Sequence, residues 1–143
     1  MPTSDIQTVQ QANASFYRAF EKKDLDAMGQ IWSHGIGSLC IHPGRAAIKG
    51  WDDIRTSWAT IFKHTQYLEI ELDIISTEIQ GDLAYVVGTE TLMQVSRGRR
   101  LEAKSMATNI FERMGNRWYL IHHHGSPLAQ WRYLNVAMHC LKT

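Results

Sequence analysis

Three consecutive histidines, His122, His123 and His124, are the residues of this chain whose type and spacing most strongly suggest chemistry. An imidazole changes charge near neutral pH, so it can donate or accept a proton, form hydrogen bonds or bind a metal ion. The histidines follow the apolar run 118–121, which is typical of a strand. Because strand side chains alternate, His122 and His124 share one face and His123 lies on the other. We therefore expect His122 and His124 to line a ligand site.

Two groups are candidates for acid/base catalysis, which needs a side chain that titrates near the working pH. His124 is one of them. Glu90 is the other, because it lies in the middle of an alternating segment between Thr89 and Thr91. Whether the Glu90 carboxyl faces inward depends on strand register, since a slip of one residue reverses the face. A solvated carboxylate on the strand surface is the alternative interpretation.

A third imidazole, His42, stands before Pro43 at the end of a short apolar segment. Together with His122 and His124 it makes a feasible zinc set. No carboxylate or cysteine shows a matching spacing, so we expect no metal ion. The sequence also has no phosphate-binding loop, and we expect no cofactor.

The chain has five tryptophans in 143 residues, enough for an aromatic wall around a flat organic molecule. Aromatic side chains also dominate the cores of small domains, so a plain core is the alternative interpretation. The candidate ligand-binding residues are Trp32, Trp51, Trp58, Tyr85, Asn109 and Phe111, together with His42, His122 and His124.

Predicted helices carry the candidate residues that come first along the chain. Ser4 and Gln7 stand in capping-box positions before an amphipathic stretch, which predicts a helix over 5–22. Asp24 can cap a short second helix that ends near His34. A third helix opens at 50–53, and its apolar residues are Trp51, Ile54, Trp58, Ile61 and Phe62.

Strands position the rest. Residues 38–42 read as a short strand between the second and third helices. From residue 67 onward apolar and polar residues alternate over 67–79, 83–96, 100–113 and 117–125, with glycine-containing turns between the segments. The pattern predicts an α+β fold in which three N-terminal helices pack on one face of a strongly curved, mostly antiparallel sheet. Such a cone-shaped sheet has a default ligand site at its mouth.

Length and composition narrow the functional classes. The 143 residues predict a single domain over 1–143, with a core over 5–126 and an apolar extension over 127–143 that packs on the domain or on a partner. Fifteen basic and fourteen acidic residues leave a net charge of +1, which argues against nucleic-acid binding. No run approaches the roughly 18 apolar residues of a membrane span. Two cysteines a hundred residues apart and no recognisable signal peptide favour the cytoplasm.

Several motifs in this order resemble the nuclear transport factor 2-like superfamily and, within it, the SnoaL-like group. The motifs are 16–20 and 23–28 in the helical pair, 48–54 at the start of the third helix, and Trp118 followed by 122–126. The resemblance covers about residues 6–126. It implies a cone-shaped, cystatin-like fold, frequent dimerisation through the sheet, and an interior pocket whose chemistry varies among members.

The last strands are also similar to the association domain of calcium/calmodulin-dependent kinases. The matching residues are Thr108, Phe111, Arg113, Trp118, His122, His124 and Ser126. That domain carries an arginine where Asn109 stands here, and its last turn is offset by one residue from Gly115-Asn116. Its anionic pocket therefore does not carry over intact.

Three functions stay open at this point. The first is a homodimeric protein that binds a small organic molecule through His42, His122 and His124. The second is a cofactor-independent isomerase, cyclase or dehydratase with His124 or Glu90 as the proton carrier. The third is an association module in which the sheet face and the segment after Ser126 build an oligomer.

Overall fold

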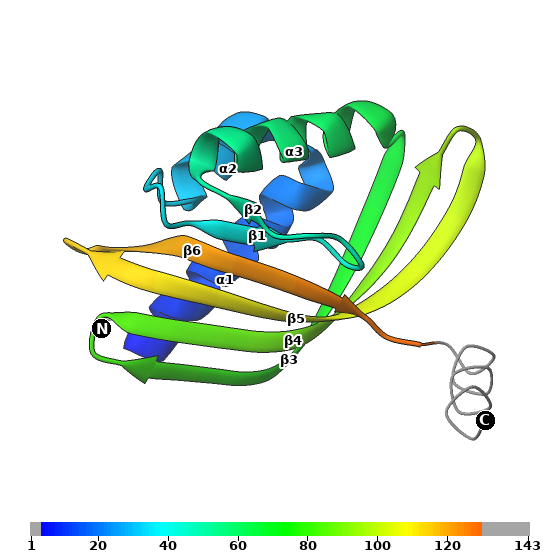
Figure 1. Ribbon diagram of the computed structural model, residues 1–143. Helices are drawn as coiled ribbons and strands as arrows, with labels where there is room; N and C mark the ends of the chain where they lie inside the picture. The colour runs from blue at the N-terminus through cyan, green and yellow to red at the C-terminus, as the bar shows by residue number, and fades with distance from the viewer. Residues whose placement is uncertain (1–3, 130–143) are drawn as a thin grey trace, which may run out of the picture.

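The computed structural model describes residues 4–129, in which three helices cover one face of a six-stranded sheet (Figure 1). The strand order is β2-β1-β6-β5-β4-β3. Strands β3 to β6 form the antiparallel meander that the alternation predicts, and β1 pairs with β6 in parallel. The α+β fold expected from the sequence is therefore confirmed, with a sheet that is curled but not closed.

The helices begin where the sequence places capping residues. Helix α1 (Asp5–Lys22) has the full capping box between Ser4 and Gln7. Helix α2 (Leu25–Ile31) begins after Asp24, whose carboxylate accepts from the backbone N–H of Ala27. Helix α3 (Trp51–His64) has Asp52 and Asp53 in its first turn and Lys63 and His64 in its last, as the helix dipole favours.

Helix α2 is shorter than the sequence predicts, because its last apolar residue joins the sheet. Trp32 leaves the helix in an extended conformation and forms a parallel bridge with Leu120. The backbone N–H of Ser33 then donates to the carbonyl of Leu120 at 2.9 Å. This pairing ends the helix at Ile31, before the predicted end near His34.

The strands of the meander are long enough to bend. Their bounds are β3 (Tyr67–Gln80), β4 (Leu83–Ser96), β5 (Arg99–Met114) and β6 (Arg117–Pro127). The turn between β4 and β5 has a positive φ at both Arg97 and Gly98, as a tight hairpin requires. Strand β1 (Leu39–Ile41) is the short strand that the sequence indicates, whereas β2 (Ile48–Lys49), its antiparallel partner, was not predicted.

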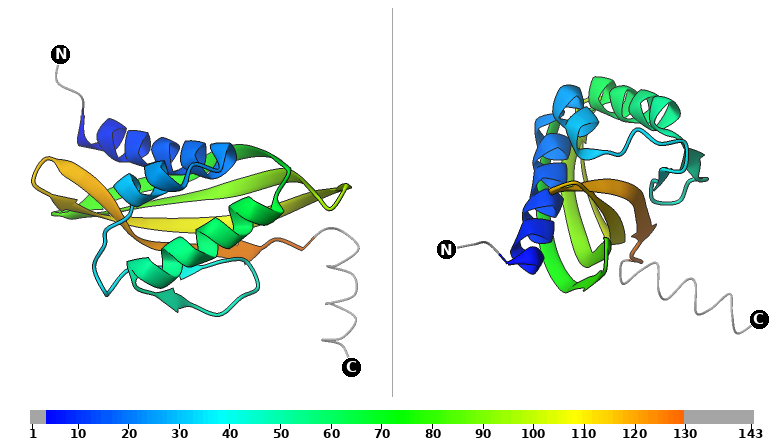
Figure 2. Two further views of the ribbon diagram at one scale, coloured as in Figure 1. Left: turned by 90° about the horizontal axis from the view of Figure 1, so that it is seen from above. Right: turned by 90° about the vertical axis from the view of Figure 1, so that its left-hand side faces the viewer.

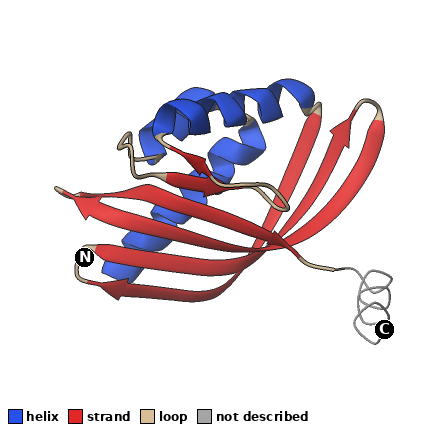
Figure 3. Ribbon diagram, in the orientation of Figure 1, coloured by secondary structure: helices blue, strands red, loops and turns tan. Residues whose placement is uncertain are grey.

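The core lies between the helices and the concave face of the sheet (Figures 2 and 3). Phe16 of α1 is fully buried at its centre and makes edge-to-face contacts with the rings of Trp32 and Trp58. Such aromatic pairs add to the stabilisation that burial of their area provides. These contacts join a residue of α1 to one of α3 and to the residue that follows α2, so they help to hold all three helices against the sheet.

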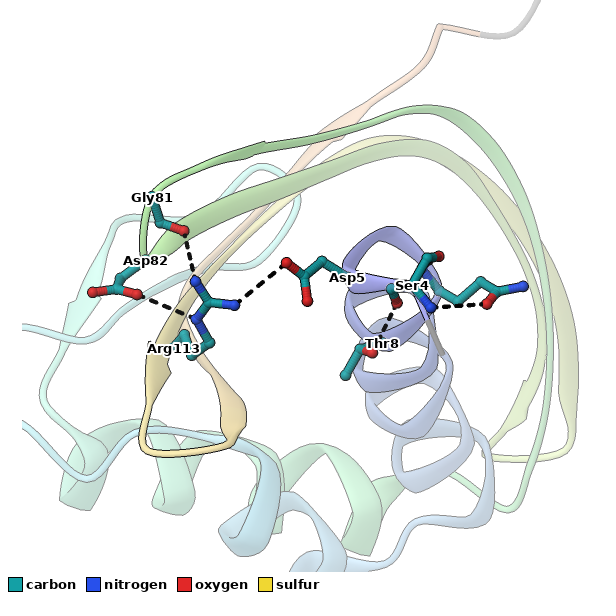
Figure 4. Close-up of polar contacts among 7 residues, drawn as sticks. Ser4, Asp5, Thr8, Gly81, Asp82 and Arg113 are labelled. Atoms are coloured by element: carbon teal, nitrogen blue, oxygen red, sulfur yellow. Dashed lines mark hydrogen bonds and ion pairs between the residues drawn. The ribbon is translucent and has the colours of Figure 1, made fainter. Parts of the chain in front are cut away.

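One side chain ties the start of α1 to the turn between β3 and β4 (Figure 4). The guanidinium of Arg113 donates to the carboxylate of Asp82 at 3.2 Å and to the carbonyl of Gly81 at 3.4 Å, and it pairs with Asp5 at 3.5 Å. It also lies 5.0 Å from the ring centre of Trp118. These contacts are partly exposed, so they orient the turn more than they stabilise the fold.

None of the helices in the described part of the chain is long and apolar enough to cross a membrane. The expected extension over 127–143 lies, from residue 130 onward, outside the described residues. Strand β6 itself continues two residues past the predicted end, to Pro127. The backbone N–H of Leu128 then donates to the carbonyl of Lys104 at 2.8 Å.

The bend in the middle of the meander depends on one glycine. Strand β3 has an irregular register between Ile74 and Ser76, opposite Gly88 of β4. A Cβ atom at Gly88 would lie 2.9 Å from the backbone oxygen of Asp73 and 3.2 Å from Leu72 Cδ1. Glycine at this point lets the two backbones approach closely, as is common beside a bulge.

Gly88→Ala should therefore destabilise the fold by about 1–3 kcal/mol, because the backbone of β3 cannot move away from the new methyl group without straining the bulge. The measurement is the midpoint of urea unfolding. Gly37→Ala is the matched control: a Cβ at Gly37 meets no atom within 4 Å. Equal midpoints for the two variants would contradict the assignment of Gly88 to the bend.

Candidate functional site

A β-bulge in β6 decides which histidine reaches the interior. Ile110 of β5 pairs with His122 and the next residue, Phe111, pairs with Leu120, so Ile121 is an extra residue in the ladder. Leu120 faces the helices before the bulge, and His123 faces them after it. His123 is 1% exposed and its ring centre lies 4.9 Å from that of Phe16.

His122 and His124 share a face as the alternation predicts, but it is the face away from the helices. His122 is half-buried, His124 is exposed, and their ring centres are 6.2 Å apart. The sequence does not fix which face of the strand meets the helices, and the bulge, which shifts the alternation by one residue, places this pair on the outer face. Tyr85 also lies on the outer face and is 41% exposed. A ligand-binding role for these three residues stays a prediction.

The amide of Asn109 connects three polar side chains inside the core. His123 Nδ1 donates to Asn109 Oδ1 at 2.5 Å, which leaves His123 as the neutral tautomer with its proton on Nδ1. Asn109 Nδ2 donates to Asn13 Oδ1 at 2.8 Å and to the hydroxyl of Tyr17 at 3.2 Å. We call Asn13, Tyr17, Glu90, Asn109 and His123 the interior network.

Glu90 of β4 is the last member of the interior network. Its carboxyl accepts from the Tyr17 hydroxyl at 2.5 Å, and the residue is 2% exposed. Burial raises the pKa of Glu90 to about 7, although the hydrogen bond from Tyr17 partly lowers it. Burial, with the nearby Glu90 charge, also raises the pKa of Tyr17 above its usual range. The pKa of Glu90 therefore lies closer to neutral pH than that of an exposed glutamate.

His42 lies beside this network at the end of β1, as the sequence indicates. Its Nε2 is 2.6 Å from the hydroxyl of Ser57 and 3.7 Å from the sulfur of Cys40, and its ring stands edge-on to Trp58 at 4.9 Å. Burial lowers the pKa of His42 to about 4, helped by the charge of Arg45. Burial likewise lowers the pKa of His123 to about 3. Both imidazoles are thus neutral hydrogen-bonding groups at physiological pH.

The predicted aromatic wall is a packed core. Trp32, Trp58 and Phe111 are fully buried and belong to one cluster. Trp51 lies at the far end, where its ring stacks on His34 at 4.9 Å. Two hollows formed by the described residues both lie on the outer surface, a larger one of 460 Å³ between α1 and α2 and a smaller one of 250 Å³ beside α2.

Sequence reasoning missed three members of the interior network: Asn13, Tyr17 and His123. The helical spacing of Asn13, Phe16, Tyr17 and Phe20 puts an amide on the apolar stripe of α1, and this signal could have identified Asn13 and Tyr17. No comparable signal exists for His123. Its face follows from the bulge, which leaves no mark in the sequence.

The sequence matches the SnoaL-like domain family over residues 9–130. Among solved structures, it is similar to a candidate dehydratase of the NTF2-like family from Streptomyces avermitilis, with 30% identity and a TM-score of 0.81 over 88% of this chain and 97% of the other. It is also similar to a candidate calcium/calmodulin-dependent protein kinase type II association domain from Thiobacillus denitrificans. There the identity is 27% and the TM-score 0.77, over 85% of this chain and 96% of the other.

A similar curated protein is the F-box protein SKIP8 of Arabidopsis thaliana. The identity is 28% over 116 residues, which are 81% of this chain and 48% of the plant protein. This chain therefore spans about half the length of that relative.

The buried carboxyl predicts a specific pH dependence of folding. Because the pKa of Glu90 is higher in the folded protein than in the unfolded chain, its contribution is present below about pH 4.5 and is lost as the pH rises to about 7. His42 and His123, with lowered pKa values, contribute in the opposite sense, and their stabilisation is lost in acid. Glu90→Gln should therefore gain stability relative to wild type, by up to about 3 kcal/mol, between about pH 4.5 and pH 7.5.

The measurement is the free energy of urea unfolding across this range. Glu102→Gln is the matched control, since it removes an exposed carboxyl from β5. A difference between Glu90→Gln and wild type that does not change with pH would contradict the account.

Proposed function

This chain belongs to the SnoaL-like domain family, and we propose that it binds a small organic molecule at the interior network. Polar groups buried in an aromatic core destabilise a fold unless each finds a partner. Proteins that retain such groups usually use them at a functional site. The buried network, drawn from α1, β4, β5 and β6, supports this proposal.

The observation that carries the proposal is an unused donor. Asn13 Nδ2 is buried and finds no acceptor among the described residues, and the same holds for the indole Nε1 of Trp58. The Trp58 ring lies 6.2 Å from the His123 ring, so this second donor belongs to the same part of the core. An uncharged molecule with a carbonyl or hydroxyl oxygen on an aromatic body would satisfy such donors. Because the aromatic core around these donors is packed, it must open locally and repack around the molecule, so association should be slow.

A test uses 2-acetylnaphthalene, an uncharged aromatic ketone, and follows its binding by protein ¹H–¹⁵N spectra. Asn13→Leu removes the free donor and should weaken binding about tenfold, the effect of one lost hydrogen bond in a buried site. Asn116→Leu, in the exposed turn between β5 and β6, is the matched control and should bind as wild type does.

Equal affinity of Asn13→Leu and wild type would contradict the proposal, as would shifts confined to the outer surface. If Asn13→Leu does not fold, Asn13→Asp keeps the size of the side chain and replaces the donor by an acceptor. The same tenfold loss is then expected.

Acid/base catalysis is the second candidate function, favoured by the pKa of about 7 at Glu90. A carboxylate of this pKa accepts a proton from a weakly acidic C–H bond far better than an exposed glutamate does. The Tyr17 hydroxyl orients it at 2.5 Å. His124, the other predicted proton carrier, is exposed on the outer face. The interior geometry therefore favours Glu90.

The corresponding prediction concerns deuterium exchange at the methyl group of 2-acetylnaphthalene. The rate attributable to the protein should rise with pH and level off above about pH 7, because the base form of Glu90 accumulates through its pKa. Glu90→Gln should abolish this rate and Glu102→Gln should leave it unchanged. Exchange that persists in Glu90→Gln would exclude Glu90 as the base.

A homodimer through the outer face of the sheet is part of the proposal. The fold is compatible with a homo-oligomer, since a calcium/calmodulin-dependent protein kinase association domain shares it. Leu83 and Tyr85 of β4 are 48% and 41% exposed on or beside this face. Exposed apolar side chains of this size are typical of a surface that another subunit covers. The His122 and His124 pair would then lie near that interface.

A further inference from the structure

We propose that the 460 Å³ hollow on the outer side of α1 binds a small organic anion, independently of the interior network. The hollow lies between α1, α2 and the turn that joins β5 to β6. Three cationic side chains from two separate parts of the chain line it, namely Arg18, Lys22 and Arg117. Its volume falls in the range of sites that take a small molecule.

Arg18, Lys22 and Arg117 form no ion pair in the described part of the chain. Between residues 4 and 129, the ion pairs are the two that Arg113 makes, with Asp5 and Asp82. Asp24 is the one acidic residue that lines the hollow, and its carboxylate already accepts from the backbone N–H of Ala27. The lining therefore carries an excess positive charge, which favours an anionic ligand.

One of the three cations is held in place before any ligand arrives. Arg117 Nη2 donates to the backbone carbonyl of Gln30 at 3.3 Å, and its guanidinium lies 5.1 Å from the ring centre of Tyr119. A guanidinium fixed in this way loses less conformational freedom when it binds a carboxylate, sulfonate or phosphate. The remaining donors of the guanidinium stay available for such a group.

The lining also predicts an apolar part of the ligand. Besides polar side chains, it includes Ala12, Ala19, Ile31 and the indole of Trp118. The small side chains of α1 allow a flat body to approach the helix closely, and the exposed edge of Trp118 borders the same hollow. An inorganic anion alone would leave this surface uncovered. The structure therefore favours an anionic group on an aromatic or aliphatic body.

The test uses naphthalene-2-sulfonate, with 2-naphthalenemethanol as its uncharged analogue. Binding is followed by ¹H–¹⁵N shifts and by calorimetry at low and at physiological ionic strength. The sulfonate should shift the amide signals of Ala12, Ala19 and Trp118, and salt should weaken it. The double variant Arg18→Gln/Lys22→Gln should bind the sulfonate at least tenfold more weakly than wild type does. The affinity of wild type for the uncharged alcohol should be no higher than the affinity of the double variant for the sulfonate.

The matched control is Arg99→Gln/Arg100→Gln, which removes two exposed cations at the far turn between β4 and β5 and should leave the affinity unchanged. The proposal is overturned if the alcohol binds as tightly as the sulfonate, or if the shifts map to the interior network. It is also overturned if an acidic peptide such as acetyl-Glu-Glu-Phe-Glu-Glu-amide binds there and the sulfonate does not.

Discussion

The hydrogen bonds of the Asn109 amide hold the interior of this protein together. Its oxygen accepts from His123 of β6, and its nitrogen donates to Asn13 and Tyr17 of α1. Tyr17 in turn donates to Glu90 of β4, so the network as a whole links the first helix to three strands. Because each bond lies in a low-dielectric core, its loss would leave a partner unsatisfied. The network and the packing of α1 on the sheet thus depend on each other.

The bulge at Ile121 decides which histidine meets the amide. With regular alternation, His122 rather than His123 would pair with Asn109. The extra residue instead turns His123 inward and leaves the neighbouring pair on the outer face. The inward ring is neutral, since burial lowers its pKa to about 3. It therefore orients the amide as a hydrogen-bond donor and brings no charge into the core.

The sequence predicted most helices and strands closely, but it predicted only two members of the interior network. The two outcomes have different physical reasons. Capping residues, helical spacing and long alternation are local signals, so α1 and the four meander strands could be placed closely. Glu90 and Asn109 were predicted as site residues, and both lie in the network. Faces are set by pairing between strands, which is not local: the bulge in β6 places His122 and His124 on the outer face, where Tyr85 of β4 also lies.

Helix α1 serves two surfaces with different chemistry. Asn13 and Tyr17 bind its inner side to the network, while Arg18 and Lys22 line the hollow on its outer side. A ligand at one side can affect the other only if it favours a different position of the helix. The inner side is fixed by hydrogen bonds and by the rings around Phe16, so such a displacement would break several contacts at once. Helix α1 is therefore held rigidly between the two surfaces, and binding at one proposed site should leave the other unchanged.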